Sequence, residues 1–247
     1  MNVLIVYSHP EPTSFTAALK DTALQVLVEA GHTVEVSDLH GEGFSPVPGR
    51  HDFTTVADAE RFHYQTEQIY ASQHSGFAPD LVREQARVVN AHLIVFLFPL
   101  WWGGLPAILK GWFDRVLAYG FAYADGKRYE SGFFHGRRGL LGISTGGTAQ
   151  RFTRDGSYGD IEQVLHGVQH CMLEYLGLKV EVPFVAYAAP RIDQQAREQL
   201  LRDWQERLLT TLADPIWQHE MQVDAARKLG QQHSSAAAEG AAWATAR

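Results

Sequence analysis

Residues 92–117, HLIVFLFPLWWGGLPAILKGWFDRVL, constrain the fold most, because they fit only a strand, a short loop and a helix in immediate succession. Residues 93–98 are uniformly apolar, the pattern of a strand covered on both faces within a parallel sheet. Pro106 begins the helix at a position where its missing N–H is not needed. Asp114 and Arg115 are expected on the outer face of this helix. The loop between strand and helix is the first candidate binding site, since cofactors of open α/β sheets lie at the carboxyl ends of central strands.

The rest of the chain alternates short apolar runs with amphipathic segments, which predicts an α/β fold with a doubly wound parallel sheet and helices on both faces. The expected strands are residues 3–7, 33–36, 93–98, 139–144 and 179–185. The first expected helix begins at Thr13 or Ser14 and ends at Gly31. Further helices are expected over residues 79–90, 106–117, 159–175 and 192–212, and residues 53–75 are expected to be partly helical. Five parallel strands favour the flavodoxin-like strand order.

The chain is long enough for one sizeable domain, with 247 residues of which 45% are hydrophobic. The pattern contains neither an internal repeat nor an interdomain linker. Residues 1–213 are therefore expected to form a single domain, and residues 214–247 a C-terminal extension. Residues 231–247 are rich in Ala, Ser and Gln, which is typical of a tail.

Charge and cysteine content exclude several classes of protein. A formal charge of -7, from 21 Lys+Arg and 28 Asp+Glu, argues against nucleic-acid binding. A single cysteine, Cys171, excludes an internal disulfide framework and a multi-cysteine metal site, and is expected to be a buried, inert thiol. The sequence has no apolar run long enough for a membrane span and no signal peptide pattern. We therefore expect a cytoplasmic protein without membrane insertion.

Three loops follow the first, third and fourth strands, and their chemistries complement one another. Residues 8–16 offer hydroxyls and free amides at a helix N-terminus, where phosphate binds well. Trp101 and Trp102 offer flat faces for ring stacking, and Gly146 and Gly147 offer exposed amides to a polar ring edge. Together these features describe a flavin site, whereas the missing GxGxxG pattern disfavours a Rossmann-type dinucleotide site. Each feature alone is also explained by helix capping, core packing or a dimer interface.

Four stretches carry a resemblance to a known family: LIVYSHPEPTSF, VSDLHGEGFSPV, FPLWWGGLPAILKGWFDRV and STGGTAQRFTRDGSYGD. Over about residues 1–213 the sequence resembles the NAD(P)H:quinone oxidoreductases of the two-electron, flavin-containing type, which have a flavodoxin-like fold. The resemblance implies FAD as cofactor, NAD(P)H as hydride donor and a quinone-like acceptor reduced by a ping-pong mechanism. It also implies a homodimer with two sites at the subunit interface.

The resemblance assigns roles to individual residues. It places His9, Ser14, Phe15 and Thr16 at the pyrophosphate and ribityl region, Pro99, Leu100, Trp102 and Gly103 along the isoalloxazine ring, and Thr145, Gly146 and Gly147 at its pyrimidine edge. Trp101 of the same loop is expected to bind the cofactor through its flat face. Adenine-side positions of the longer, FAD-binding members fall on His63, Asp114 and Arg197. This match favours FAD over FMN, because the shorter FMN-binding relatives lack the inserted region and the final helix.

The sequence departs from the family pattern at the site of the chemistry. The family's tyrosine and histidine near the flavin N1/O2 edge fall on Phe152 and Tyr158, and Phe152 cannot donate a hydrogen bond. One pocket tyrosine of the family falls on Tyr123 but the other on Asp125. In the loop of residues 100–105, here called the tryptophan loop, an aromatic residue of the family is replaced by Gly103. The expected catalytic groups are therefore Tyr158 and the amides of Gly146 and Gly147, and the expected lining of a rebuilt acceptor pocket is Tyr123, Asp125 and Phe152.

Other interpretations stay open on the sequence alone. An accessory subunit of a membrane transport protein would co-purify with its partner, and a flavodoxin-like electron carrier would ignore NAD(P)H. His166, His170 and Glu174 recur at four-residue spacing beside Cys171, as metal ligands on one helical face would. Helical histidines beside an apolar face are more often structural, so no metal is expected.

Overall fold

The computed structural model of the chain describes residues 1–215 and 217–221. It consists of two units, Met1–Leu209 and Thr210–Arg247, and the first contains the sheet and the cavities discussed below. Most of the expected extension over residues 214–247 lies outside the described residues. Within the described part of the chain, no helix is both long and apolar enough to cross a membrane.

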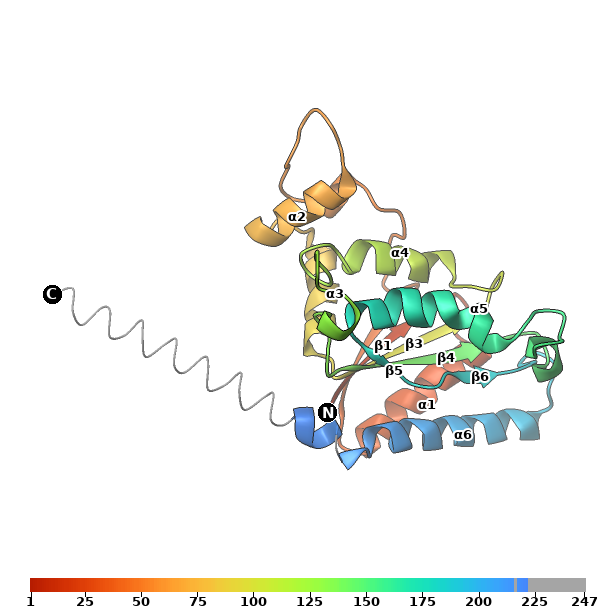
Figure 1. Cartoon of the computed structure of the whole chain (residues 1–247). Helices are drawn as coiled ribbons and strands as arrows, with labels where there is room; N and C mark the ends of the chain where they lie inside the picture. The colour runs from red at the N-terminus through yellow and green to blue at the C-terminus, as the bar shows by residue number, and fades with distance from the viewer. Residues whose placement is uncertain (216, 222–247) are drawn as a thin grey trace. The chain divides into compact units, whose positions relative to one another are not determined.

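A parallel sheet with the strand order β2-β1-β3-β4-β5 forms the centre of the first unit (Figure 1). Its strands are β1 (Asn2–Tyr7), β2 (Thr33–Asp38), β3 (Leu93–Pro99), β4 (Arg138–Ser144), β5 (Lys179–Val180) and β6 (Phe184–Ala186). Every residue of β3 and β4 is buried, as a central strand covered on both faces requires. The predicted α/β class and flavodoxin-like order are confirmed.

The single fifth strand expected over residues 179–185 is wrong, because two short strands, β5 and β6, each pair with β4. Pro183 lies between them and has no N–H to donate to the ladder. The Glu181 amide still donates to the Gly139 carbonyl at 2.8 Å. The chain therefore stays beside β4 until the proline interrupts the pairing.

Helices cover both faces of the sheet (Figure 1). The α-helices and their bounds are α1 (Phe15–Glu29), α2 (Tyr64–His74), α3 (Pro79–Asn90), α4 (Ala107–Val116), α5 (Ile161–Val168) and α6 (Gln194–Leu212). Figure 1 shows α3, α4 and α5 against one face and α1 with α6 against the other. The helix expected over residues 159–175 begins as α5 and continues through a π-helical turn and a 3-10 turn to Gly177, whose φ is 94°. Residues 53–75 are helical only in part, as expected.

The expectation that Arg115 faces outward is wrong. Its side chain is 2% exposed, and its guanidinium binds Asp52 at 2.7 Å and Asp80 at 3.0 Å. Burial alone would lower the pKa of Arg115, but the hydrogen bond and charge of Asp52 raise it above its ordinary value. The guanidinium therefore stays charged inside the protein. It joins α4 to α3 through Asp80 and to the 3-10 turn Arg50–Asp52 through Asp52.

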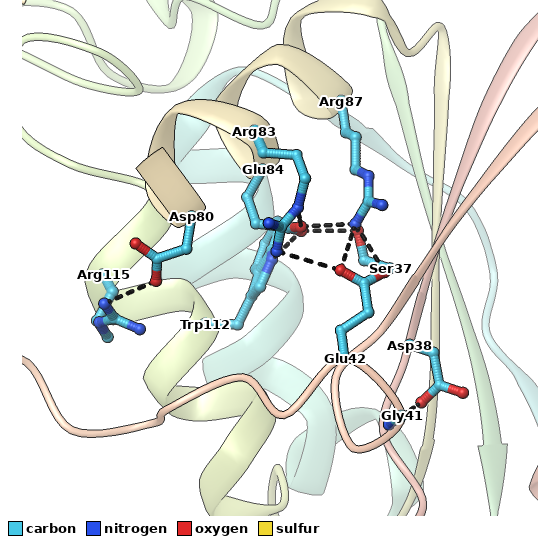
Figure 2. Close-up of polar contacts among 10 residues, drawn as sticks. All are labelled: Ser37, Asp38, Gly41, Glu42, Asp80, Arg83, Glu84, Arg87, Trp112 and Arg115. Carbon is cyan, nitrogen blue, oxygen red and sulfur yellow. Dashed lines mark hydrogen bonds and ion pairs between the residues drawn. The ribbon is translucent and has the colours of Figure 1, made fainter. Parts of the chain in front are cut away.

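Glu84 is the centre of a second buried polar group between α3 and α4 (Figure 2). Its carboxylate accepts from Ser37 Oγ at 2.7 Å, from Trp112 Nε1 at 2.9 Å and from Arg87 Nη1 at 2.6 Å. Arg87 also binds Glu42 at 2.9 Å. These bonds fasten both helices to the end of β2, and they leave the charged groups with partners.

Candidate active site at the carboxyl edge of the sheet

The loops after β1, β3 and β4 line a cleft of about 560 Å³, here called the main cleft. Parallel strands place their carboxyl ends at one edge of the sheet, so loops that lie far apart in sequence meet there. The predicted cofactor residues in its lining are His9, Ser14, Phe15, Thr16, Pro99, Leu100, Trp101, Thr145, Gly146 and Arg197. The fold thus gathers most of the predicted cofactor site into one space.

The N-terminus of α1 supplies unpaired amides to the main cleft. Ser14 caps the helix, since its Oγ accepts from the Ala17 amide at 3.1 Å. The next amides, those of Phe15 and Thr16, have no acceptor among the described residues, and both residues line the cleft. Free amides at the positive end of a helix dipole form an anion site suited to phosphate.

Arg197 and His9 add two further donors to the main cleft. The Arg197 Nε is buried without a hydrogen-bond partner in the described structure. The His9 Nδ1 accepts from the Glu11 amide at 3.0 Å, so a neutral His9 carries its proton on Nε2. Burial lowers the pKa of His9, which favours this neutral form near pH 7. The cleft is therefore rich in donors that the protein itself does not satisfy.

A buried pair of hydroxyls ties the first loop to the fourth strand. Thr16 Oγ1 and Ser144 Oγ lie 2.7 Å apart, and the two residues are 1% and 8% exposed. Either hydroxyl can donate to the other. This single bond joins two walls of the main cleft that are 128 residues apart in sequence.

The tryptophan loop forms a tight turn that turns one indole into solvent. The Gly104 amide donates to the Trp101 carbonyl at 2.9 Å, and the two central residues, Trp102 and Gly103, have φ values of 52° and 68°. A bulky residue with positive φ is strained, so the loop spends energy to hold this shape. Trp101 is 46% exposed beside the His9 ring, and Trp102 is 105% exposed. Core packing is therefore excluded for both tryptophans.

A second space of about 580 Å³, here called the adjoining cavity, shares Leu100, Thr145 and Gly146 with the main cleft. The predicted residues in the rest of its lining are Trp102, Gly103, Gly147, Phe152 and Tyr158. Arg151 and Arg191 also line it, although the sequence analysis singled out neither. Arg151 precedes Phe152 directly, so its place in the motif could have marked it.

The two loop glycines after β4 differ in what they offer. Gly146 is exposed, and its amide has no acceptor among the described residues. Gly147 is buried and donates to Thr145 Oγ1 at 3.1 Å, so the expectation that both amides are exposed is wrong for Gly147. A Cβ on Gly147 would lie 2.7 Å from the Phe152 ring and 2.9 Å from that of Tyr158. Glycine is needed there for close packing of the aromatic wall.

Tyr158 is held with its hydroxyl available to the adjoining cavity. Its ring lies 5.1 Å from that of Phe152, and the two side chains are 49% and 7% exposed. The Tyr158 hydroxyl accepts from Arg151 Nη1 at 3.1 Å. Because the oxygen accepts that bond, its own proton remains free to donate to a ligand.

Comparison with known proteins identifies the family. The model of a protein family with the description "flavodoxin-like fold" matches residues 1–208. The chain belongs to this family. Ribosyldihydronicotinamide dehydrogenase [quinone] of Pongo abelii is 41% identical over 219 residues, 88% of this chain and 93% of the relative. NAD(P)H dehydrogenase [quinone] 1 of Rattus norvegicus is 40% identical over 84% of this chain and 76% of the relative. The resemblance to quinone oxidoreductases seen in the sequence is confirmed.

Two solved structures support the same family. The crystal structure of a protein described as a quinone reductase from Klebsiella pneumoniae has a TM-score of 0.83 and 36% identity, over 87% of this chain and 85% of that chain. An NAD(P)H:quinone oxidoreductase from Methanothermobacter marburgensis has a TM-score of 0.67 and 28% identity, over 84% of this chain and 97% of that chain. The flavodoxin-like family thus accounts for the whole sheet and the loops at its carboxyl edge.

Some residues assigned through the family lie elsewhere in this chain. His63, Asp114 and Tyr123 line a third cavity of about 680 Å³, which shares no lining residue with the main cleft or the adjoining cavity. His63 caps α2 through Nδ1, and Asp114 binds Lys110 at 2.6 Å. The structure therefore separates two of the adenine-side residues from Arg197, which lines the main cleft.

Asp125 and Cys171 also differ from expectation. Asp125 is exposed, binds Arg128 at 3.3 Å and belongs to the lining of none of the three cavities described above. Cys171 is exposed and lines the third cavity, so the expectation of a buried thiol is wrong. Next to it, His170 binds Glu174 at 2.6 Å and stacks on His166. Among the described residues, no group of three or more potential ligands could hold a metal ion.

Proposed function

We propose that this protein is a flavin-dependent NAD(P)H oxidoreductase that reduces quinones or related electrophiles by two electrons. The observation that carries the proposal is an anion site directly beside a ring site. Phe15 and Thr16, whose amides have no acceptor among the described residues, line the same cleft as Arg197 and Trp101. Relatives that are 41% and 40% identical over most of their length are named quinone dehydrogenases.

The residues present fit a flavin. Phosphate would accept from the α1 amides and from His9 Nε2, and the ring would lie along Leu100 and the tryptophan loop. A bound flavin supplies hydride acceptance from NAD(P)H and hydride delivery to the acceptor. We propose FAD rather than FMN, because Arg197 of α6 also lines the main cleft and gives it a further charged group.

The chemistry assigned to this chain's own residues concerns charge at the ring edge. Tyr158 offers a hydroxyl proton that Arg151 orients, and Gly146 offers a free amide. Donors that are fixed before reaction stabilise developing negative charge without reorganising. Phe152 contributes an apolar wall and no donor, so Tyr158 is the proposed side-chain donor.

We also propose a homodimer. His63, Asp114 and Tyr123 line a cavity separate from the main cleft, and the fully exposed Trp102 has no partner ring among the described residues. A second subunit that presents its third cavity to the main cleft would account for both observations. Light scattering should give the mass of a dimer at micromolar concentration, whereas an active monomer would contradict this part of the proposal.

One experiment tests the function directly. The purified protein is denatured, the released flavin is identified by mass, and the bound flavin of intact protein is followed under anaerobic NADH or NADPH before quinones, nitroaromatics and azo compounds are added. We expect FAD, fast bleaching by at least one nucleotide and reoxidation by quinones in a ping-pong pattern. A flavoprotein that ignores both nucleotides would instead be an electron carrier, and a stable membrane partner would favour an accessory subunit.

A cytoplasmic location is part of the proposal, since Cys171 leaves no internal disulfide to maintain.

A further inference from the structure

Two guanidinium groups border the adjoining cavity. Arg151 belongs to the short 3-10 helix Ala149–Phe152 that follows the loop of β4, and Arg191 follows β6. Both side chains are exposed, and both line the cavity together with Tyr158. Two separate segments of the chain therefore bring positive charge to the same space.

Neither group is neutralised by the protein. Arg151 Nη1 donates to the Tyr158 hydroxyl at 3.1 Å, and Arg191 Nη1 donates to the Gly146 carbonyl. These acceptors are uncharged, and within the described residues no carboxylate forms an ion pair with either arginine. A guanidinium has five N–H donors in a planar fork, so each retains several for a ligand.

This arrangement differs from that of three arginines that are paired with carboxylates. Arg115, Arg87 and Arg138 each bind a carboxylate at 2.9 Å or less. The whole chain carries a formal charge of -7, so unpaired positive charge at one cavity opposes the overall field. A cavity lined by one sign of charge attracts ligands of the opposite sign.

The rest of the wall selects for shape. Leu100, Phe152 and Val164 are apolar, and Phe152 is 7% exposed behind Gly147. The cavity of about 580 Å³ is within the usual size of a small-molecule site, and the acceptor would share it with the flavin ring that is proposed to lie along Leu100. An apolar wall with two cations at its border fits a flat aromatic body that carries an anionic group.

We propose that Arg151 and Arg191 make this enzyme selective for acceptors with an anionic substituent, a sulfonate or carboxylate on an aromatic ring. The inference rests on the proposed function and names its substrate class. The same oxyanion chemistry also exists in the phosphates of the nucleotide, so the experiment must separate acceptor from hydride donor.

Binding to the oxidised holoprotein tests the recognition without turnover. Naphthalene-2-sulfonate and its neutral isostere naphthalene-2-sulfonamide are titrated by calorimetry into the parent and into Arg151→Gln and Arg191→Gln. Each substitution should weaken sulfonate binding about tenfold, the scale of a charged hydrogen bond, and change sulfonamide binding less than about twofold. Added salt should weaken sulfonate binding to the parent. Arg154→Gln is the matched control, because Arg154 is exposed in the same segment but does not line the cavity.

Turnover then distinguishes the sources of the anion. With NADH in excess, the ratio of kcat/KM for 1,4-naphthoquinone-2-sulfonate to kcat/KM for 2-methyl-1,4-naphthoquinone should fall about tenfold in either variant, and this ratio cancels any effect on both quinones that acts through Tyr158. Equal losses for both quinones or for both naphthalene probes would overturn the selectivity. Slower flavin reduction by NADPH but not NADH, with unchanged quinone kinetics, would assign the arginines to the nucleotide phosphate and also overturn it. If flavin reduction fails with both nucleotides while sulfonate binding keeps its arginine dependence, the proposed function fails and the anion site stands.

Discussion

The polar network between α3 and α4 and the main cleft treat polar groups in opposite ways. In the network, the guanidinium of Arg115 and the carboxylate of Glu84 are buried and bound by several partners (Figure 2). In the cleft, the amides of Phe15 and Thr16 and the Nε of Arg197 have no partner within the described residues. The first region uses its polar groups to hold helices in place. The second keeps donors open, which is useful only where a ligand completes them.

The network side of this comparison should break with the largest effect. Arg115→Met would remove the buried guanidinium that pairs with Asp52, a carboxylate that is 0% exposed and that would keep the Tyr64 hydroxyl, the Gly49 amide and the exposed His51 ring as partners. Leaving a buried charge unpaired typically costs about 3–5 kcal/mol, so we expect the free energy of unfolding to fall by that amount. Denaturant unfolding of the apoprotein measures it.

Lys110→Met on the same helix is the matched control. Lys110 binds Asp114 at 2.6 Å, but the side chains are 52% and 45% exposed. An exposed pair of this spacing contributes about 0.3–0.5 kcal/mol at most. Similar losses for the two variants would show that burial is not what makes the Arg115 pair important.

Arg115 also shows where sequence reasoning stopped. The apolar runs of β3 and β4 and the loops between elements predicted the sheet, its order and the place of the main cleft, because these follow from local pattern and strand polarity. A buried arginine looks like a surface residue in any helical pattern, since its partner Asp52 is 63 residues away. The exposed Cys171 is the converse case, an apolar type that the irregular helix after α5 turns outward.

The candidate site was predictable to the same extent. Residues fixed by the ends of strands, such as His9 and Thr145, lie where the sequence placed them, because the fold brings those loops together. His63 and Asp114 do not reach the main cleft within one chain, and one sequence does not reveal which positions a second subunit would supply. Arg191 escaped notice because no local motif marks a single arginine in a loop after a short strand.

On the side of the candidate site, the largest effect is expected at Tyr158, which lines the adjoining cavity beside the main cleft. Tyr158→Phe removes the hydroxyl whose proton is free to donate, and it leaves the Gly146 amide in place. Loss of one preorganised donor often costs a hundredfold or more, so with an amide remaining we expect flavin reduction by NAD(P)H to slow at least about tenfold. Stopped flow measures the rate, and the flavin content should stay close to that of the parent.

Phe152→Tyr is the reverse test. A new hydroxyl beside Tyr158 would restore the donor that the family pattern has at this position, and it should speed flavin reduction or quinone turnover. Parent-like reduction in Tyr158→Phe would make Tyr158 structural and assign charge stabilisation to the backbone alone.

The tryptophan loop should sharpen the comparison with a smaller effect. Trp102 is 105% exposed in the single chain, so Trp102→Ala should leave the unfolding of the dissociated apoprotein chain unchanged. Loss of an aromatic wall corresponds to about 0.5–1.5 kcal/mol beyond buried area, and we expect flavin affinity to fall by up to about tenfold. Fluorescence titration of the apoprotein with flavin measures it. Val56→Ala, another exposed apolar residue that lines none of the three cavities, should change neither quantity, and unchanged flavin affinity in Trp102→Ala would remove this loop from the site.

The smallest effect is expected at a satisfied bond inside the wall of the main cleft, the buried hydroxyl pair of Thr16 and Ser144. Thr16→Val keeps the shape of the side chain but leaves Ser144 Oγ without a partner, which should lower the free energy of unfolding by about 1 kcal/mol. Ser144→Ala should cost a similar amount, and because a buried donor without an acceptor is worse than neither, the double variant should cost less than the sum of the two. Thr13→Val, whose hydroxyl bonds Glu11 at 2.7 Å in solvent, serves as control and should cost less than about 0.5 kcal/mol. Strictly additive losses in the free energy of unfolding at Thr16 and Ser144 would mean that the bond does not couple the two walls. The sheet alone would then determine the shape of the main cleft.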